Sequence, residues 1–111
     1  MTELRLRTST KRELVDITAE VATVVEKSGL AEGLCHVYVA HATAAIVVNE
    51  NDDPNVCVDL LDALDRLIPA GIWRHDRVDG NAAAHINGKN PVLIARPRAK
   101  APSRTSRCAD R

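Results

Sequence analysis

The chain has 111 residues, of which 45% are hydrophobic, and its 15 basic and 15 acidic side chains cancel to a formal net charge of zero. That length is typical of one domain, and the apolar share excludes a chain that is disordered throughout. No stretch approaches the roughly 20 apolar residues of a membrane helix, and the N-terminus lacks the apolar core of a signal peptide. We therefore predict a cytoplasmic protein that has no membrane partner.

The chain has three cysteines, Cys35, Cys57 and Cys108, and no C-x-x-C pair. An odd number of widely spaced cysteines favours neither a disulfide framework nor a structural zinc site. Cys35 and Cys57 lie in apolar stretches, so we expect both thiols to pack as small hydrophobic groups.

The first 30 residues predict two strands and a helix. Residues 4–8 alternate apolar and charged side chains, which is typical of a half-buried strand, and a second strand is expected at about 13–17. Thr18 is a good N-cap for a helix over about 19–28, and Gly29 is suited to the left-handed residue that follows a helix.

The middle of the chain predicts two more strands and a long helix. Residues 33–40 and 44–49 are rich in strand formers, and His41 lies at the junction between them. Asp53 and Pro54 are favourable for the cap and first turn of a helix over 54–68. Four apolar residues at helical spacing give that helix one buried stripe: Cys57, Leu61, Leu64 and Ile68.

The charge distribution divides the chain near residue 86. Residues 1–86 contain 8 basic and 14 acidic side chains, whereas residues 87–111 contain 7 and 1. After a long connection over 70–84, residues 91–95 predict one more strand, so we assign residues 1–95 to the domain. Residues 96–111 predict a basic, disordered tail. Phosphate contacts by such a tail could bind nucleic acid, but without interleaved aromatic residues that partner is not favoured.

Three histidines, His41, His75 and His85, stand at the ends of predicted elements or in the long connection. Three imidazoles are a familiar ligand set for zinc, although their spacing here is no motif by itself. Glu50 or Asp52 could orient one of these rings or help to hold a divalent cation near a phosphate. Arg74 could bind an anionic group, and Asn81 lies in a turn that is a weaker candidate for ligand binding.

The same residues resemble a known family. The segment from His41 to Pro54 (HATAAIVVNENDDP) resembles the H-T-[ST]-A-x-x-x-x-N-E-N-x-D-P segment of the YjbQ-like family, known as secondary thiamine-phosphate synthases. Residues 73–75 (WRH) and 81–86 (NAAAHI) resemble its [YW]-x-H and N-x-x-x-H-[IL] segments. The order and the spacing of all three segments agree.

The resemblance implies an α+β fold, in which a mixed sheet forms a half-barrel with two helices, and a homotrimer. It implies a pocket in which His41, His75 and His85 bind a divalent ion, zinc or magnesium, or an anion. His41, His75, His85 and Glu50 are the implied catalytic residues, and Thr43, Asn49, Arg74 and Asn81 the substrate-binding ones. The implied secondary activity joins a pyrimidine diphosphate to a thiazole phosphate and releases pyrophosphate.

The sequence departs from the family pattern in two places. Ala42 replaces the threonine that usually follows the first histidine, and the further strands that the family has after residues 85–86 are missing. We therefore expect a truncation or frameshift at about residues 87–91. Three functions remain open: an enzyme for phosphorylated substrates, a non-catalytic trimer that binds an anion or metal, and an inactive truncated copy.

Overall fold

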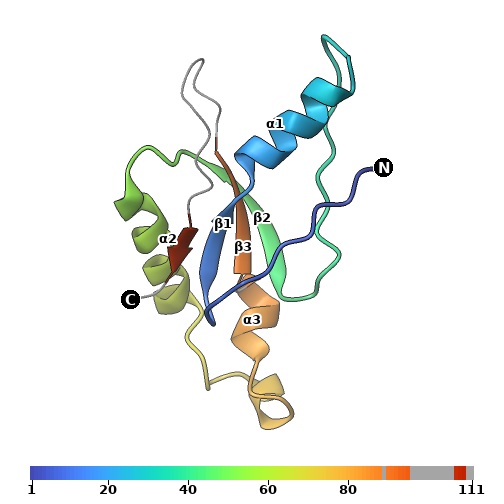
Figure 1. Cartoon of the computed structure of the whole chain (residues 1–111). Coiled ribbons are helices and arrows are strands. Elements are labelled where there is room, and N and C mark those ends of the chain that lie inside the picture. The colour runs from blue at the N-terminus through green and yellow to red at the C-terminus, as the bar shows by residue number, and fades with distance from the viewer. Residues whose placement is uncertain (89, 96–106, 110–111) are drawn as a thin grey trace.

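The computed structural model describes residues 1–88, 90–95 and 107–109. Its strands form one mixed sheet in the order β2-β3-β1-β4 (Figure 1). The strands are β1 (Glu13–Asp16), β2 (Ala44–Asn49), β3 (Asn90–Ala95) and β4 (Arg107–Ala109). Strand β3 runs parallel to both β1 and β2, whereas β4 is antiparallel to β1. The α+β expectation is therefore confirmed.

Three α-helices and one short 3₁₀ helix complete the described elements: α1 (Thr18–Lys27), α2 (Pro54–Leu67), η1 (Arg74–Arg77) and α3 (Ala82–Asn87). Figure 1 shows α1 and α2 on opposite sides of the sheet, and α3 below the end at which β3 begins. None of the helices in the described ranges is long and apolar enough to cross a membrane.

The two faces of the sheet bury separate apolar clusters because neighbouring side chains of a strand point to opposite faces. On one face Leu14 packs with Cys57 and Leu61 of α2. On the other face Val15 and Ile17 form the buried centre of a second cluster. The partly buried residues around this second cluster include Val21 of α1 and, from the stretch before β2, Val37 and Val39.

Helix α2 confirms its sequence signals. The Asp53 carboxylate accepts a hydrogen bond from the Asn55 backbone N–H at 2.9 Å, and Pro54 occupies the first turn, where its missing N–H costs nothing. Helix α1 also forms where it was expected, but Ile17 is its cap residue and Thr18 is already helical. The Asp16 carboxylate, which accepts from the Thr18 backbone N–H at 2.9 Å, satisfies the first turn instead.

Two predicted strands are wrong. Neither residues 4–8 nor residues 33–40 form a strand, and Leu4, Leu6, Leu34 and Tyr38 are exposed. Their composition favours extended backbone, but a strand also needs a hydrogen-bonded neighbour, and neither segment pairs with a strand of the described sheet. Cys35 lies in one of these segments and is exposed, so the expected packing of cysteines holds for Cys57 alone.

The connection over 70–84 is more ordered than expected, since it contains η1 and the start of α3. The predicted strand over 91–95 is confirmed as β3. Of the tail predicted over 96–111, residues 96–106 and 110–111 lie outside the described residues. Within it, Arg107–Ala109 forms β4 and pairs with β1, and the disordered tail as a whole stays a prediction.

Candidate functional site

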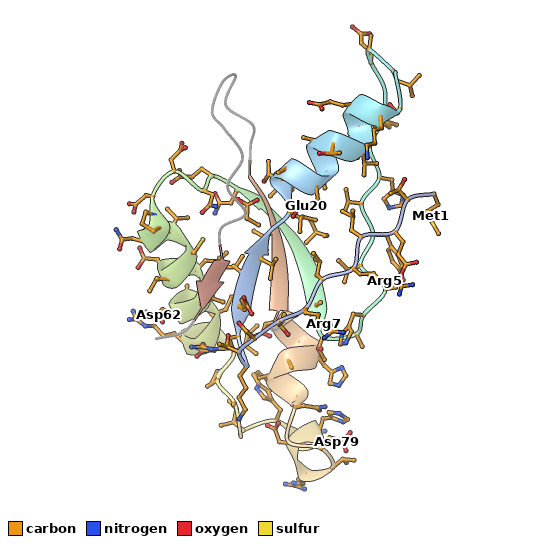
Figure 2. The ribbon with its side chains drawn as sticks, in the orientation of Figure 1. Met1, Arg5, Arg7, Glu20, Asp62 and Asp79 are labelled. Carbon is orange, nitrogen blue, oxygen red and sulfur yellow. The ribbon has the colours of Figure 1, made fainter. Side chains whose placement is uncertain are left out.

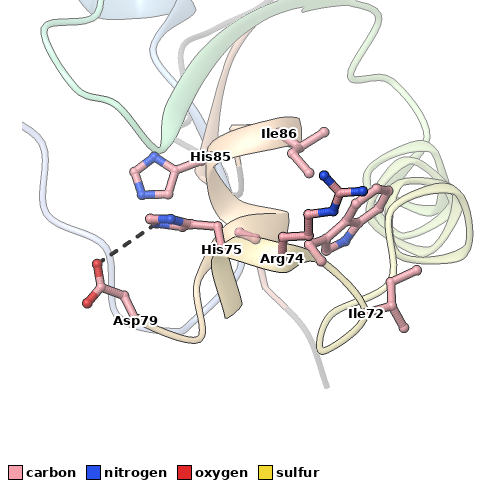
Figure 3. Close-up of a pocket in the computed structure, with 8 residues that line it drawn as sticks. Ile72, Arg74, His75, Asp79, His85 and Ile86 are labelled. Carbon is pink, nitrogen blue, oxygen red and sulfur yellow. Dashed lines mark ion pairs between the residues drawn. The ribbon is translucent and has the colours of Figure 1, made fainter. Parts of the chain in front are cut away.

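An open pocket of about 780 Å³ lies between η1 and α3 (Figure 3). Most of its lining is apolar, and its polar groups are one guanidinium, two imidazoles and one carboxylate. The lining residues are Ile72, Trp73, Arg74, His75, Asp79, Ala82, His85 and Ile86. An apolar pocket with a few converging polar groups is the usual form of a small-molecule site.

Helix α3 presents His85 to this pocket because its other side is anchored in the protein. Ala82, Ala83 and Ala84 are all buried, whereas His85 and Ile86 are exposed. Beyond the helix, Gly88 has a φ of +58°, and a Cβ atom there would lie 2.7 Å from the Ala45 Cβ on β2. Only glycine suits this position, since it accepts both the left-handed backbone and the close approach of β2.

Asp76 fixes the shape of the pocket wall although it does not line the pocket. Its Oδ2 accepts hydrogen bonds from the backbone N–H groups of Trp73 at 3.0 Å and Gly71 at 3.1 Å. Its Oδ1 accepts from the Ala82 N–H at 3.0 Å. The Trp73 hydrogen bond, with those from Ala82 and Gly71, holds the pKa of Asp76 below its ordinary value against the opposing effect of desolvation. One carboxylate therefore ties the start of η1 to the start of α3.

The two pocket histidines contact each other edge to face. The ring centroids of His75 and His85 are 5.2 Å apart and the ring planes are inclined by 84°. Asp79 lies between η1 and α3 (Figure 2), and its Oδ2 is 3.9 Å from His75 Nε2, at ion-pair distance (Figure 3). His85 has no such partner, because no carboxylate of the described residues lies within ion-pair range of its ring.

Arg74 supplies the permanent positive charge of the pocket. Its side chain is exposed, and its guanidinium forms no ion pair within the described part of the chain. A guanidinium carries five N–H donors in a planar fork that matches carboxylate and phosphate oxygens. Figure 3 shows the guanidinium on the Ile86 side of the pocket and the two imidazoles together on the other side, so the pocket offers donors for an anion from two sides.

His41 and Thr43 lie outside this lining, in the turn that leads into β2. The His41 ring is exposed, and its Nδ1 accepts a hydrogen bond from the Thr43 backbone N–H at 3.1 Å. The Thr43 Oγ1 is 3.0 Å from the same nitrogen. This local bond orients the ring toward its own turn.

Glu50 and Asn49 lie still farther from the pocket, at the opposite end of β2. In the parallel ladder Ala44 is level with Asn90, which follows α3 closely, whereas Asn49 is level with Ala95. At about 3.3 Å per residue, the five steps from Ala44 to Asn49 span roughly 17 Å. Within one chain Glu50 is therefore too distant to orient a pocket histidine.

Asn81 begins α3 but does not line the pocket. Its backbone carbonyl accepts from the N–H groups of Ala84 and His85. Its side-chain Oδ1 is buried without a hydrogen-bond partner. In the described structure Asn81 therefore positions His85 through the backbone.

The described residues contain no group of three or more His, Cys, Asp or Glu side chains that could hold a metal ion. His75 and His85 meet, but His41 is not with them, so the three-histidine metal site stays a prediction. The residues gathered in this chain fit an anion better than a three-ligand metal ion.

Sequence reasoning missed two polar residues that shape the molecule. Asp76 stands three residues after Trp73, the cap of η1, and an acidic residue at that spacing is a known capping signal. Asn51 donates a 2.7 Å hydrogen bond to Asp16 Oδ2, 35 residues away, which no local pattern could reveal.

Comparison with known proteins identifies the family to which this chain belongs. The model of the family described as UPF0047 protein YjbQ-like matches residues 2–90. A UPF0047 protein of Methanocaldococcus jannaschii is 39% identical over 82 residues, which cover 74% of this chain and 59% of that protein. YugU of Bacillus subtilis is 37% identical over 86 residues, which cover 75% of this chain and 63% of YugU.

A UPF0047 protein of Archaeoglobus fulgidus is 40% identical over 96 residues, which cover 83% of this chain and 73% of that protein. No solved structure matches the chain. The chain spans about three fifths of the length of the Methanocaldococcus jannaschii protein and of YugU. Because the family match includes β1, β2, α2 and the whole pocket, the chain belongs to the UPF0047 YjbQ-like family.

Proposed function

We propose that the pocket between η1 and α3 binds a small phosphorylated molecule through Arg74, His75 and His85. The observation that carries this proposal is an unpaired guanidinium and two contacting imidazoles, against one carboxylate (Asp79), on a pocket whose remaining lining is mostly apolar. Ile72, Trp73 and Ile86 offer apolar surface to the uncharged part of the ligand. The Trp73 Nε1 donates to the Pro69 carbonyl at 2.7 Å, so its ring is held in place for such a contact.

Our specific hypothesis for the chemistry is the secondary activity that the family resemblance implies. In that reaction a pyrimidine diphosphate joins a thiazole phosphate and pyrophosphate leaves with its negative charge. Stabilisation of this departing charge is the kind of contribution that preorganised donors make. Arg74 would hold the leaving pyrophosphate, while His75 and His85 would donate hydrogen bonds to its oxygens.

A divalent zinc or magnesium ion is a further part of the proposal and supplies Lewis-acid stabilisation of phosphate charge when bound. Within the described residues, no three donor side chains converge on such an ion. Assembly as a homotrimer and completion of the sheet to a half-barrel likewise stay proposals. Each would add groups to the pocket from outside the described chain.

The second candidate is a protein that binds the same anions without turnover. The observation that favours it is the distance of Glu50 from the pocket, which leaves the single chain without the residue proposed to orient a histidine. Both candidates share the binding step, so they differ only in product formation.

The experiment is a pyrophosphate-release assay with both phosphorylated substrates, next to calorimetric titration with pyrophosphate alone. If the protein is an enzyme, we expect the wild type to release pyrophosphate. His85→Ala should abolish this release and should also bind pyrophosphate more weakly. Binding without release in the wild type would support the non-catalytic function. Equal pyrophosphate affinity in the wild type and in His85→Ala would contradict the proposed site.

A further inference from the structure

A second hollow lies beside α1, and we call it the α1 hollow. It has a volume of about 310 Å³ and forms between one face of α1 and the first residues of the chain. Its lining residues are Thr2, Leu4, Glu20, Thr23, Val24 and Lys27, and none of them lines the pocket between η1 and α3. The volume is at the lower limit of small-molecule sites, so a ligand of the α1 hollow is small.

The helical wall of the α1 hollow follows from the spacing of its residues. Positions three, four and seven apart share one side of a helix, and four lining residues have this spacing: Glu20, Thr23, Val24 and Lys27. The extended N-terminal segment supplies the other wall through Thr2 and Leu4. Figure 2 shows Glu20 near the start of α1 and Met1 at the end of that segment.

Glu20 brings a carboxylate without a partner to the α1 hollow. Its Oε2 is buried, and no described residue donates a hydrogen bond to it. A buried, charged acceptor without a donor is unfavourable. The first turn of α1 stabilises the charge through the helix dipole, but it supplies no N–H to this oxygen. Rotation about the last side-chain bond exchanges the two oxygens, so either one can face a donor in the hollow.

Lys27 brings the opposite charge to the other end of the α1 hollow. Its side chain is exposed and forms no ion pair within residues 1–88, 90–95 and 107–109. The seven residues from Glu20 to Lys27 correspond to roughly 10 Å along the helix axis. A small molecule that carries both an ammonium group and a carboxylate can bridge these two charges.

The remaining lining residues match such a molecule. The Thr23 hydroxyl donates to the Ala19 carbonyl at 2.9 Å, so its oxygen is left as an acceptor. Thr23 stands one turn after Glu20, and the acceptors of the helical wall are therefore neighbours at that end of the hollow. Val24 lies between Glu20 and Lys27 along the helix, and with Leu4 it offers apolar surface.

We propose that the α1 hollow binds a free amino acid with a small apolar side chain. The ammonium group of the ligand donates hydrogen bonds to the Glu20 carboxylate and to Thr23 Oγ1, and its carboxylate accepts from the Lys27 ammonium group. Leu4 and Val24 contact its side chain. An inorganic cation would be repelled by Lys27, and an inorganic anion would leave Glu20 without a donor. This site does not depend on the function proposed for the pocket between η1 and α3.

The probe is L-valine, compared with two analogues that each lack one charged group. Isovalerate lacks the ammonium group and isobutylamine lacks the carboxylate, and both keep the branched side chain. NMR titration of the isotope-labelled wild type should show saturable binding of L-valine at millimolar concentration, with shifts confined to α1 and the first residues of the chain. Isovalerate should bind about tenfold more weakly, because a charged hydrogen bond is lost. Isobutylamine should bind about threefold more weakly, because Lys27 is exposed and its charge is screened.

Variants of the two charged residues connect each preference to one side chain. Glu20→Gln should weaken L-valine binding about tenfold and abolish the preference for L-valine over isovalerate. Its matched control is Glu26→Gln, at an exposed position of the same helix outside the hollow, which should keep both the affinity and the preference. Lys27→Met should weaken L-valine binding about threefold and abolish the preference for L-valine over isobutylamine.

Circular dichroism shows whether each variant is folded. Lys27→Met keeps the proposal testable if Glu20→Gln does not fold, because the Lys27 side chain is exposed. The absence of saturable L-valine binding would overturn the proposal, and so would shifts that lie on η1 and α3 instead of α1. Equal losses in Glu20→Gln and Glu26→Gln, or a wild type that binds isovalerate as tightly as L-valine, would also overturn it.

Discussion

Replacement of Arg74 by alanine is the most direct test of the pocket as an anion site. Arg74 lines the pocket, is exposed and has no ion pair in the described structure, so its charge is available to a ligand. A matched control is Arg77, an arginine of the same 3₁₀ helix that does not line the pocket. Both substitutions remove one positive charge from η1, and only one removes it from the pocket wall.

The size of the effect follows from the exposure of Arg74. Two unit charges 4 Å apart interact with about 1 kcal/mol in water and about 4 kcal/mol near a protein surface of effective dielectric constant 20. Because the guanidinium is exposed, we expect the lower part of that range, roughly 1–2 kcal/mol. This corresponds to a loss of affinity of about 5- to 30-fold, at 1.4 kcal/mol for each factor of ten.

The assay is isothermal titration with pyrophosphate at 50 mM and at 500 mM salt, concentrations chosen to change the screening. At low salt Arg74→Ala should weaken binding about tenfold and Arg77→Ala less than about threefold, since the Debye length at 0.1 M is about 10 Å. High salt should reduce the difference between the variants. Equal weakening by both substitutions would refute the reasoning, because it would indicate a general field of η1 rather than a contact in the pocket.

Two further predictions concern stability. Because hydrogen bonds hold the folded-state pKa of Asp76 below its ordinary 3.8, its carboxylate stabilises the fold above that pH, and this contribution is lost as the pH falls through the lowered value. Asp76→Asn should therefore lower the Tm at pH 7. Thermal melts should show the difference in Tm between the variant and the wild type disappearing below about pH 3.8. A difference in Tm that stays constant down to pH 2 would contradict this. Leu61→Ala should lower the free energy of unfolding by about 2–5 kcal/mol in urea titrations, because Leu61 is 3% exposed beside Leu14 and Cys57. The control Leu67→Ala, at a 75% exposed position of the same helix, should change that free energy by less than about 0.5 kcal/mol. Similar losses in both leucine variants would count against this assignment of the core.

Local signals in the sequence were sufficient for the elements that carry their own stabilisation. Helix α2 has a cap at Asp53, a proline in its first turn and an apolar stripe, and all of these act within a few residues. Strand β2 forms over residues 44–49 as expected. The pocket was anticipated in part, since Arg74, His75 and His85 line it together.

One miss arises where a segment depends on partners that are distant in the sequence, and another where a side chain rather than hydrophobic periodicity forms the element. Residues 33–40 have the composition of a strand but no ladder in the described sheet, so their tendency toward extended backbone is not realised as a strand. Residues 74–77 have no hydrophobic periodicity, yet they form η1 because the Asp76 carboxylate collects three backbone N–H groups. The first outcome cannot be read from a short window of sequence, whereas the second has a local signal in the capping spacing of Trp73 and Asp76.

What the sequence by itself determined is the family, the α+β class and the chemical types of the candidate site residues, because these depend on residue identity and local order. The tertiary structure alone decided which of those residues meet. Parallel pairing of β2 with β3 sets Glu50 at the far end of the strand from His85, whereas the packing of α3 against η1 brings His85 onto His75. The physical reason is that distance in the fold is set by strand register and helix packing, which join residues regardless of their separation along the chain.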